Sequence, residues 1–484
     1  KGHLEIVMLN IALKIEKKGD KPLYIQLYEQ IKEGIIHGSI LPETKLPSIR
    51  QLAKELDLSK TTIEAAYQQL TAEGYITSLP NIGYFASNLE HSSYIIPQNK
   101  KELKKQTIPI TPRENKKIIY DFCSNSLDQD SFDFALWRRY TNKVLKNEQR
   151  LLVYGYYQGE PELRQEIVKY LRGSRGVICD SQQVVVGAGV QSLLHLLAGL
   201  LTPAYGPIGF EEPGFRQGRY VFRDHGFTII PLQMDEEGIK IEQLHQQKIK
   251  AVYVSPSHQF PMGTAMPITR RSQLLNWAHE QGGLIIEDDY DSELRYLGRP
   301  LPSLQGLNQG KSVVYLGTFS KTMLPSLRIS YMVLPPELLD AYQKQGKQYN
   351  QTSSQIEQLT LANYLKDGCL ERQTRRLRKL YARKNQILVE AIREIMKDKV
   401  RILGQESGLH ILLEVQSSVS SEELAKLAEE AGVKVQPISS YFMDDHKAKQ
   451  KGSPSSVLLA YGGIAAEKIV PAVQSLWNSW ASLF

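Results

Sequence analysis

The chain has 484 residues, 42% of them hydrophobic, which is enough for two or three folded units with packed cores. Its three cysteines are odd in number and far apart, which argues against both a disulfide framework and a zinc site. The net charge is +7 and no apolar run is long enough to span a membrane, so we expect a cytoplasmic protein without a membrane partner.

The first stretch, Lys1 to Val7, lacks the apolar core of a signal peptide and precedes Met8, a natural start. We therefore leave Lys1 to Val7 out of the fold prediction, and expect residues 1–19 to be an added remnant and an N-terminal extension. The pattern that follows predicts a compact unit over residues 20–88.

This unit is predicted to contain three helices. Apolar residues recur at helical spacing over 24–35 and define the first helix. Ser48 and Gln51 stand in the capping-box relation at the start of the second. Ser59 caps the third, and Gly74 ends it.

The second and third helices, joined by a tight turn, form a helix-turn-helix. The third opens with Lys60, Thr61 and Thr62, at the end that enters the major groove of DNA in this geometry. The hairpin predicted over 75–85 is the wing. Double-stranded DNA is therefore the expected partner, and a helical protein-interaction module is the alternative.

Three segments of this unit, 46–53, 58–62 and 66–74, resemble the winged-helix domain of the GntR family of bacterial regulators. Where the family often has a basic residue in the wing, this chain has Asn81-Ile82-Gly83-Tyr84-Phe85. The resemblance implies contacts to phosphates and base edges, with a glycine at the wing tip, by Ser48, Arg50, Lys60, Thr61, Thr62 and Gly83.

Residues 89–118 are predicted to be a basic linker. Seven basic and two acidic side chains lie between Asn99 and Lys117, with prolines in or beside the segment and no apolar period. A solvated spacer is the favoured role, and attraction to phosphates is the second.

Over residues 119–484, strand and helix patterns alternate, which predicts an α/β domain with a mainly parallel sheet. Strand-like runs occur at 184–186, 251–254, 283–286 and 313–316. In such sheets ligands bind beyond the carboxyl ends of the strands.

The loop after the last of these strands carries a lysine beside hydroxyls and an arginine. Pyridoxal 5'-phosphate (PLP) needs an amine for its aldehyde and hydrogen-bond donors for its phosphate within reach of that amine. We expect PLP to form a Schiff base with Lys321, with Thr318, Ser320 and Arg328 near the phosphate. A surface lysine in a polar loop is the alternative.

Two further loops are expected to hold the cofactor. A glycine-containing turn leads into a helix predicted over 192–201, so the backbone amides of Gly189, Val190 and Gln191 would face the phosphate. Phe215 follows another turn and suits the face of the pyridine ring.

A buried strand ends in Glu287-Asp288-Asp289-Tyr290. PLP withdraws electrons only while its ring nitrogen is protonated, and we assign Asp288 to hold that proton. Tyr290 is expected to donate to the ring oxygen. The alternative is an acidic metal cluster, but no histidine stands nearby at ligand spacing, so no metal is expected.

From Asp121 to the C-terminus these residues resemble the fold type I aminotransferases, of the aspartate aminotransferase kind. The resemblance implies a small subdomain over about 375–484, and a homodimer in which Tyr154 reaches the neighbouring subunit's phosphate. A GntR-type winged helix fused to such a domain is the layout of the MocR regulators. That layout implies a head-to-tail dimer.

Aminotransferases bind a substrate carboxylate with arginines, but this chain has none after Arg401. Amino-acid-responsive relatives carry basic residues where we align Gln217 and Ser440, and Phe260 replaces a common asparagine. We therefore expect no catalytic turnover and a regulator that senses PLP itself, similar to the PdxR branch that controls vitamin B6 biosynthesis. An active aminotransferase and an amino-acid-responsive regulator of the GabR type stay open.

Overall fold

The computed structural model describes residues 4–8, 11–17, 20–89, 118–124, 126–202, 205–296, 298, 300–443 and 455–484. The chain divides into two compact units, Lys1–Pro112 and Arg113–Phe484, and each is described by itself. The linker expected over 89–118 lies almost entirely outside the described residues. No helix in the described ranges is long and apolar enough to cross a membrane.

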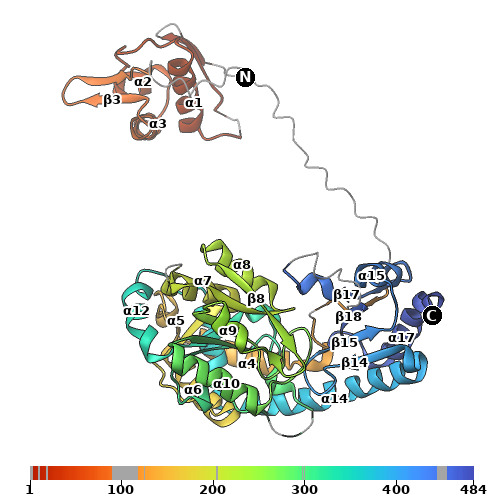
Figure 1. The fold of residues 1–484 in the computed structure, drawn as a ribbon. Helices are drawn as coiled ribbons and strands as arrows, with labels where there is room; N and C mark the ends of the chain where they lie inside the picture. Colours follow the sequence, from red (N-terminus) through yellow and green to blue (C-terminus); the bar gives the residue numbers. More distant parts are fainter. Residues whose placement is uncertain are drawn as a thin grey trace. The chain divides into compact units, whose positions relative to one another are not determined.

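The N-terminal unit is a winged helix-turn-helix (Figure 1). Its first element is an antiparallel pair of strands, followed by three helices and the two-stranded wing. Ser48 and Ser59 accept hydrogen bonds from the third backbone amide of the helix that each precedes, which explains where those helices begin. The elements are β1 (Leu4–Met8), β2 (Ile11–Ile15), α1 (Leu23–Ile36), α2 (Ile49–Glu55), α3 (Lys60–Ala72), β3 (Ile76–Leu79) and β4 (Gly83–Ala86).

The structure corrects one expectation about this unit. Strand β2 lies in the segment predicted to be an N-terminal extension of the unit 20–88, but Leu13 and Ile15 are buried in the same core as Leu27 and Ile63. The sequence alone hid this because a single alternating run of five residues has no visible partner strand. The folded unit therefore begins before residue 20.

The C-terminal unit is built on an eight-stranded sheet. Five adjacent strands run parallel, while β13 and the short β9 are antiparallel to their neighbours, so the prediction of a mainly parallel sheet is confirmed. In spatial order the strands are β6 (Val184–Ala188), β13 (Ile329–Val333), β12 (Val313–Thr318), β11 (Leu284–Asp289), β10 (Ala251–Val254), β7 (Ile208–Glu212), β8 (Ile229–Asp235) and β9 (Gly238–Ile239).

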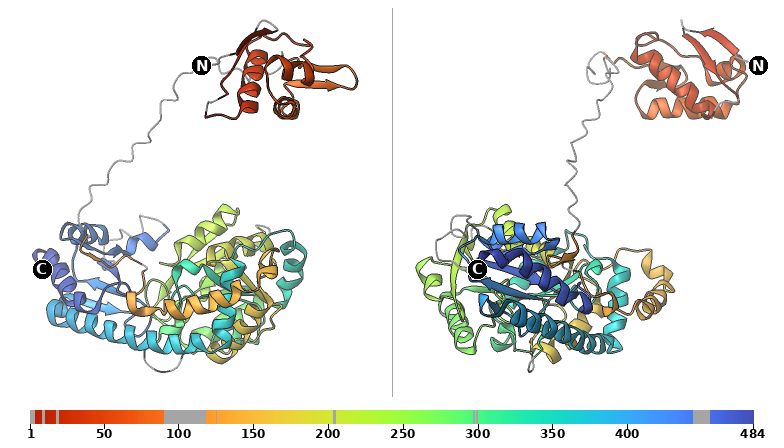
Figure 2. Two further views of the ribbon diagram at one scale, coloured as in Figure 1. Left: turned by 180° about the vertical axis from the view of Figure 1, so that it is seen from behind. Right: turned by 90° about the vertical axis from the view of Figure 1, so that its right-hand side faces the viewer.

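Helices cover both faces of this sheet (Figures 1 and 2). Neighbouring residues of one strand enter different cores, as Tyr315 and Leu316 of β12 do, because successive side chains of a strand point to opposite faces. The helices are α4 (Phe134–Leu145), α5 (Glu148–Leu151), α6 (Pro161–Arg175), α7 (Val190–Leu201), α8 (Arg216–Asp224), α9 (Glu242–Gln246), α10 (Ile268–Gln281), α11 (Leu304–Leu307), α12 (Pro336–Gly346) and α13 (Gln355–Lys366).

A long helix, α14 (Cys369–Met396), links this layer to a smaller one with its own core (Figure 2). The small layer is a four-stranded sheet with two further helices. Its core also contains Phe122, so the chain passes through this layer before building the large sheet. Its elements are β5 (Tyr120–Asp121), β14 (Val400–Leu403), β15 (His410–Val415), α15 (Ser421–Glu430), β16 (Val433–Lys434), β17 (Gln436–Pro437), β18 (Ser455–Ala460) and α17 (Ala466–Trp480).

Candidate functional sites

The start of α3 presents the residues predicted to contact DNA. Lys60 and Thr61 are exposed and Thr62 is partly buried. The hydroxyl of Ser59 accepts a hydrogen bond from the backbone amide of Thr62 at 3.1 Å. Ser48 and Arg50 are exposed at the start of α2. Contact with DNA by these side chains stays a prediction.

The wing carries a cation that the sequence pattern did not show. Gly83 has φ +130°, and a Cβ atom built there would lie 3.2 Å from Cε of Lys45. The backbone of Lys45 forms an isolated antiparallel β-bridge with that of Phe85 in β4, although Lys45 lies forty residues earlier in the chain. It therefore supplies the basic side chain beside the wing that the segment 81–85 lacks.

In the C-terminal unit, a pocket of about 510 Å³ lies at the ends of β11 and β12 and extends to the small layer. The structure brings together there every residue predicted to hold the cofactor except Tyr154, and it adds several that were not predicted. The predicted residues that line it are Gly189, Val190, Gln191, Phe215, Asp288, Tyr290, Thr318, Ser320, Lys321 and Arg328.

Lys321 follows β12 and lines this pocket. Burial lowers the pKa of its amine below the usual value, and the nearby Asp291 carboxylate opposes that effect. A lower pKa increases the fraction of neutral amine, the form that attacks an aldehyde. The position therefore suits the role predicted for Lys321.

Asp288 is buried at the end of β11, and only one of its two carboxylate oxygens has a hydrogen-bond partner among the described residues. The hydroxyl of Tyr253 donates to Oδ2, while Oδ1 has no hydrogen-bond partner among the described residues. Burial raises the pKa of this carboxyl to about 7, and the charges of Asp289 and Asp291 add to the rise. A protonated pyridine nitrogen would supply both the missing donor and a positive charge, so these residues fit PLP.

Another part of the pocket suits a phosphate. Helix α7 begins at Val190 rather than at the predicted Ser192, and Gly189 precedes it with φ 87° and ψ 164°. A Cβ atom at Gly189 would lie 2.2 Å from Nη2 of Arg328, so the guanidinium rests against this glycine. A helix N-terminus and an arginine together form an anion site.

Three hydroxyls lie in a row beside this anion site. Ser330 donates to Oγ1 of Thr318 at 2.9 Å, and Thr318 lies 3.1 Å from Ser320 Oγ. All three side chains line the pocket. Ser330 lies in β13 and is paired with Thr318 of β12.

The group that positions Tyr290 was not predicted from the sequence. Nδ1 of His258 lies 2.9 Å from an oxygen of Asp291 and 2.9 Å from the Tyr290 hydroxyl oxygen. A single Nδ1 proton of His258, shared between the carboxylate and the Tyr290 oxygen, would make both oxygens acceptors and leave the Tyr290 proton free to point into the pocket. A His258–Asp291 pair therefore orients the hydroxyl that was predicted to reach the ring oxygen.

Aromatic rings form the walls of the pocket. Phe215 stacks on Tyr253 with ring centroids 6.0 Å apart, and Phe260 packs edge-on against Tyr290 and Tyr441. Such rings exclude water from a bound pyridine.

The positions expected to bind a substrate carboxylate hold no cation. Gln217 and Ser440 both line the pocket, and Ser440 accepts a hydrogen bond from Gln436 at 2.8 Å. However, Arg216 also lines it, and its charge partly offsets the burial that raises the pKa of the Tyr441 hydroxyl to about 12. Among the described residues, the pocket therefore has no cation at these two positions, but it has the exposed guanidinium of Arg216 in addition to that of Arg328.

Tyr154 lies outside this pocket. It is 95% exposed and lines a separate hollow with Tyr349 and Gln355. A role in the pocket of a neighbouring subunit stays a prediction.

The fold and the pocket together define a DNA-binding regulator with an aminotransferase-like domain. Residues 23–85 match the model of the gntR family of bacterial regulatory proteins, and residues 117–450 match aminotransferase class I and II. That second match implies PLP binding, which is typical of the family.

The same two-part layout occurs in relatives along nearly the whole chain. The chain is 42% identical to the uncharacterized HTH-type transcriptional regulator YhdI of Bacillus subtilis over 98% of this chain and 99% of the relative. It is 30% identical to the probable rhizopine catabolism regulatory protein MocR of Rhizobium meliloti, over 97% and 96%. The chain therefore belongs to the MocR subfamily of GntR-family transcriptional regulators.

Two further likenesses bear on the effector domain. The pyridoxine biosynthesis regulator PdxR of Corynebacterium glutamicum is 32% identical over 80% of this chain and 82% of its own length. Among solved structures, the Pyrococcus horikoshii kynurenine aminotransferase has a TM-score of 0.66 at 26% identity, and covers 75% of this chain and 91% of its own.

Proposed function

We propose that this regulator binds promoter DNA through its winged helix and senses PLP itself, and that it controls genes of PLP (vitamin B6) biosynthesis. The main support is the pocket itself. It is lined by every residue predicted to bind PLP within the same subunit, but it has no cation at positions 217 and 440. Similarity to a pyridoxine biosynthesis regulator supports the choice of target genes. As a bacterial regulator of transcription, it acts in the cytoplasm.

PLP brings an aldehyde that an amine can capture and a ring that withdraws electrons. In this chain, Lys321 provides the amine, and Asp288 keeps a proton at the ring nitrogen. Arg328 and the amides at the start of α7 hold the phosphate. Phe215 covers one face of the ring, and Tyr290, oriented by the His258–Asp291 pair, donates to the ring oxygen.

PLP changes DNA affinity only if it binds two arrangements of the protein unequally. We propose that these are two arrangements of a head-to-tail homodimer in which Tyr154 completes the partner's pocket. The exposed side chains around Tyr154 support such an interface, because Leu152, Val153 and Tyr349 are 84%, 63% and 64% exposed. Isolated apolar residues need no explanation, but a cluster marks a contact surface.

Arg216 favours a second candidate, a regulator that responds to an amino acid bound beside PLP. A rim guanidinium is able to pair with a carboxylate. In that case Arg216→Gln abolishes an amino-acid-induced change in the absorption spectrum and leaves PLP binding intact. Turnover of amino acids by an active aminotransferase would instead convert the bound cofactor to its amine form.

The test is a promoter-binding assay with PLP alone and with PLP plus a panel of amino acids. PLP sensing predicts that PLP alone shifts DNA affinity in the native protein and not in Lys321→Ala. Lys344→Ala, an exposed lysine of α12, is the matched control and behaves as native. Unchanged DNA affinity with PLP, despite a cofactor absorption band, would refute the proposal.

A further inference from the structure

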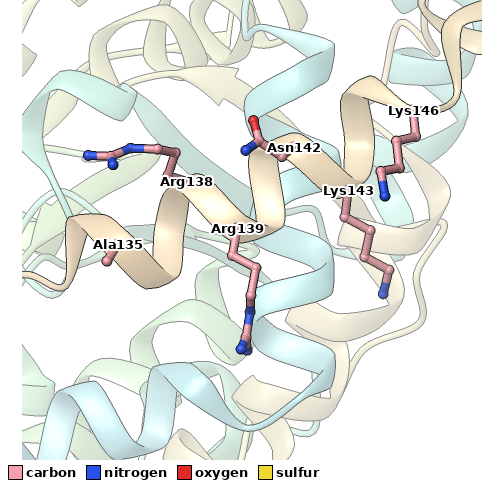
Figure 3. A pocket seen from close by; sticks show the side chains of 6 residues that line it. All are labelled: Ala135, Arg138, Arg139, Asn142, Lys143 and Lys146. Atoms are coloured by element: carbon pink, nitrogen blue, oxygen red, sulfur yellow. The ribbon is translucent and has the colours of Figure 1, made fainter.

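The helix α4 carries an exposed basic surface that plays no part in the cofactor pocket. A hollow of about 420 Å³ lies over this helix, and four of its six lining residues are basic: Arg138, Arg139, Lys143 and Lys146. Figure 3 shows Arg139, Lys143 and Lys146 projecting to the same side, and Arg138 along another edge. All four are exposed.

No acidic side chain neutralises these four cations within the parts of the chain that the structure describes. Two nearby carboxylates bond to other groups. Asp133 caps α4 by accepting a hydrogen bond from the backbone amide of Leu136, and Asp367 accepts one from the Tyr140 hydroxyl at 2.6 Å.

Helix stability does not account for this pattern. The helix dipole favours a cation in the last turn, which explains Lys143 and the C-cap Lys146. It does not explain Arg138 and Arg139 in the middle of the helix. Arg139 and Lys143 are four residues apart, a spacing at which like charges cost a few tenths of a kcal/mol, about 0.2–0.5.

Further arginines lie close to the same helix. Tyr364 of α13 packs edge-on against Trp137 and Tyr140 of α4. Burial raises the pKa of its hydroxyl, and the positive charges of Arg376 and Arg372 partly oppose that rise. Both arginines are exposed on the first turns of α14.

We propose that this surface, Arg138, Arg139, Lys143 and Lys146 with Arg372 and Arg376 beside them, binds the phosphate backbone of duplex DNA. Arg139 and Lys146 are seven residues apart, or about 10 Å along the helix. One DNA strand carries a charge every 3.4 Å of axis, so this stripe faces about three phosphates. The C-terminal unit thereby adds sequence-independent affinity to the contacts of the winged helix, whether or not PLP is the effector.

The test compares Arg139→Gln/Lys143→Gln with a control of equal charge, Lys426→Gln/Lys468→Gln, on α15 and α17. The full-length proteins are titrated with a mixed-sequence duplex of about 60 base pairs, roughly 200 Å long. Each lost phosphate contact lowers the slope of log affinity against log salt by about 0.9, so the α4 variant loses about 1.8. As the salt concentration rises from 50 to 200 mM, the ratio of native to variant DNA affinity therefore falls about tenfold.

The control variant is expected to keep the native slope, and both variants the native circular dichroism and cofactor absorption. Equal slopes in all three proteins would overturn the proposal, as would an equal loss in both variants, which would reflect net charge alone. Calorimetry with inorganic phosphate tests a small-anion site. Millimolar binding that only the α4 variant loses, without a change in DNA slope, would also overturn it.

Discussion

Replacement of Gly189 by alanine tests the phosphate end of the pocket. The backbone at Gly189 has φ 87° and ψ 164°, a region that only glycine adopts readily. An alanine there costs about 1–3 kcal/mol of folding free energy. Its Cβ would also lie 2.2 Å from Nη2 of Arg328, so the guanidinium must move.

The two costs have different readouts. Backbone strain is present with or without cofactor, so it lowers the unfolding free energy of the cofactor-free protein. Displacement of Arg328 removes a charge-assisted hydrogen bond to phosphate, worth about 1.5–3 kcal/mol. We therefore expect PLP affinity to fall roughly 10- to 150-fold.

PLP affinity is measured by titrating the cofactor-free protein and following the absorption band, and stability by denaturant unfolding. Gly173→Ala is the control, since Gly173 lies exposed inside α6 and a Cβ there meets nothing within 4 Å. That change is expected to stabilise α6 by up to about 1 kcal/mol without altering PLP affinity. A Gly189→Ala protein that is less stable but binds PLP as tightly as native would show that Arg328 does not hold the phosphate.

Two further predictions concern buried charges near the pocket. Arg175 and Asp289 are almost fully buried and 2.6 Å apart, so Arg175→Ala leaves an unpaired carboxylate and costs about 3–5 kcal/mol in denaturant unfolding. Lys169→Ala, from an exposed pair with Glu166, costs under about 1 kcal/mol, and equal losses would contradict this reasoning. Burial, and then the charges of His258 and Lys321, hold the pKa of His410 well below its usual 6.5. As the pH falls, the histidine is protonated in the unfolded chain but not in the folded one. Below pH 6.5 the unfolding free energy of the native protein therefore falls by about 1.4 kcal/mol per pH unit relative to that of His410→Asn. Parallel pH profiles of the two proteins would exclude a neutral buried His410.

The sequence predicted the elements that are defined by local chemistry. Ser59 caps α3 as expected, because capping depends on one side chain and an amide three residues away. Asp288 and Lys321 lie in one pocket as expected, because adjacent parallel strands bring their carboxyl ends to the same edge. Those inferences needed only the strand pattern and the chemistry of the loops.

Long-range contacts were beyond that reasoning. No sequence pattern assigned a role to His258, because its role depends on Asp291, thirty-three residues away. Lys45 reaches the wing across forty residues, and Phe122 joins a core built mainly from the last hundred residues. Each of these contacts depends on which segments pack together, and no local periodicity encodes that choice.

Arg216 shows how one residue changes the interpretation of a pocket. The family resemblance implied a basic residue at position 217, so Gln217 suggested a pocket without an acid-binding group. Helix α8 begins at Arg216, and successive helical residues point about 100° apart, so neighbouring side chains need not share a role. Both side chains nevertheless line the pocket, because the first turn of α8 lies at its rim. If Arg216→Gln leaves the PLP response of DNA binding unchanged, this guanidinium is not part of effector recognition. A loss of response restricted to one amino acid would instead make Arg216 the carboxylate-binding residue, and the effector an amino acid.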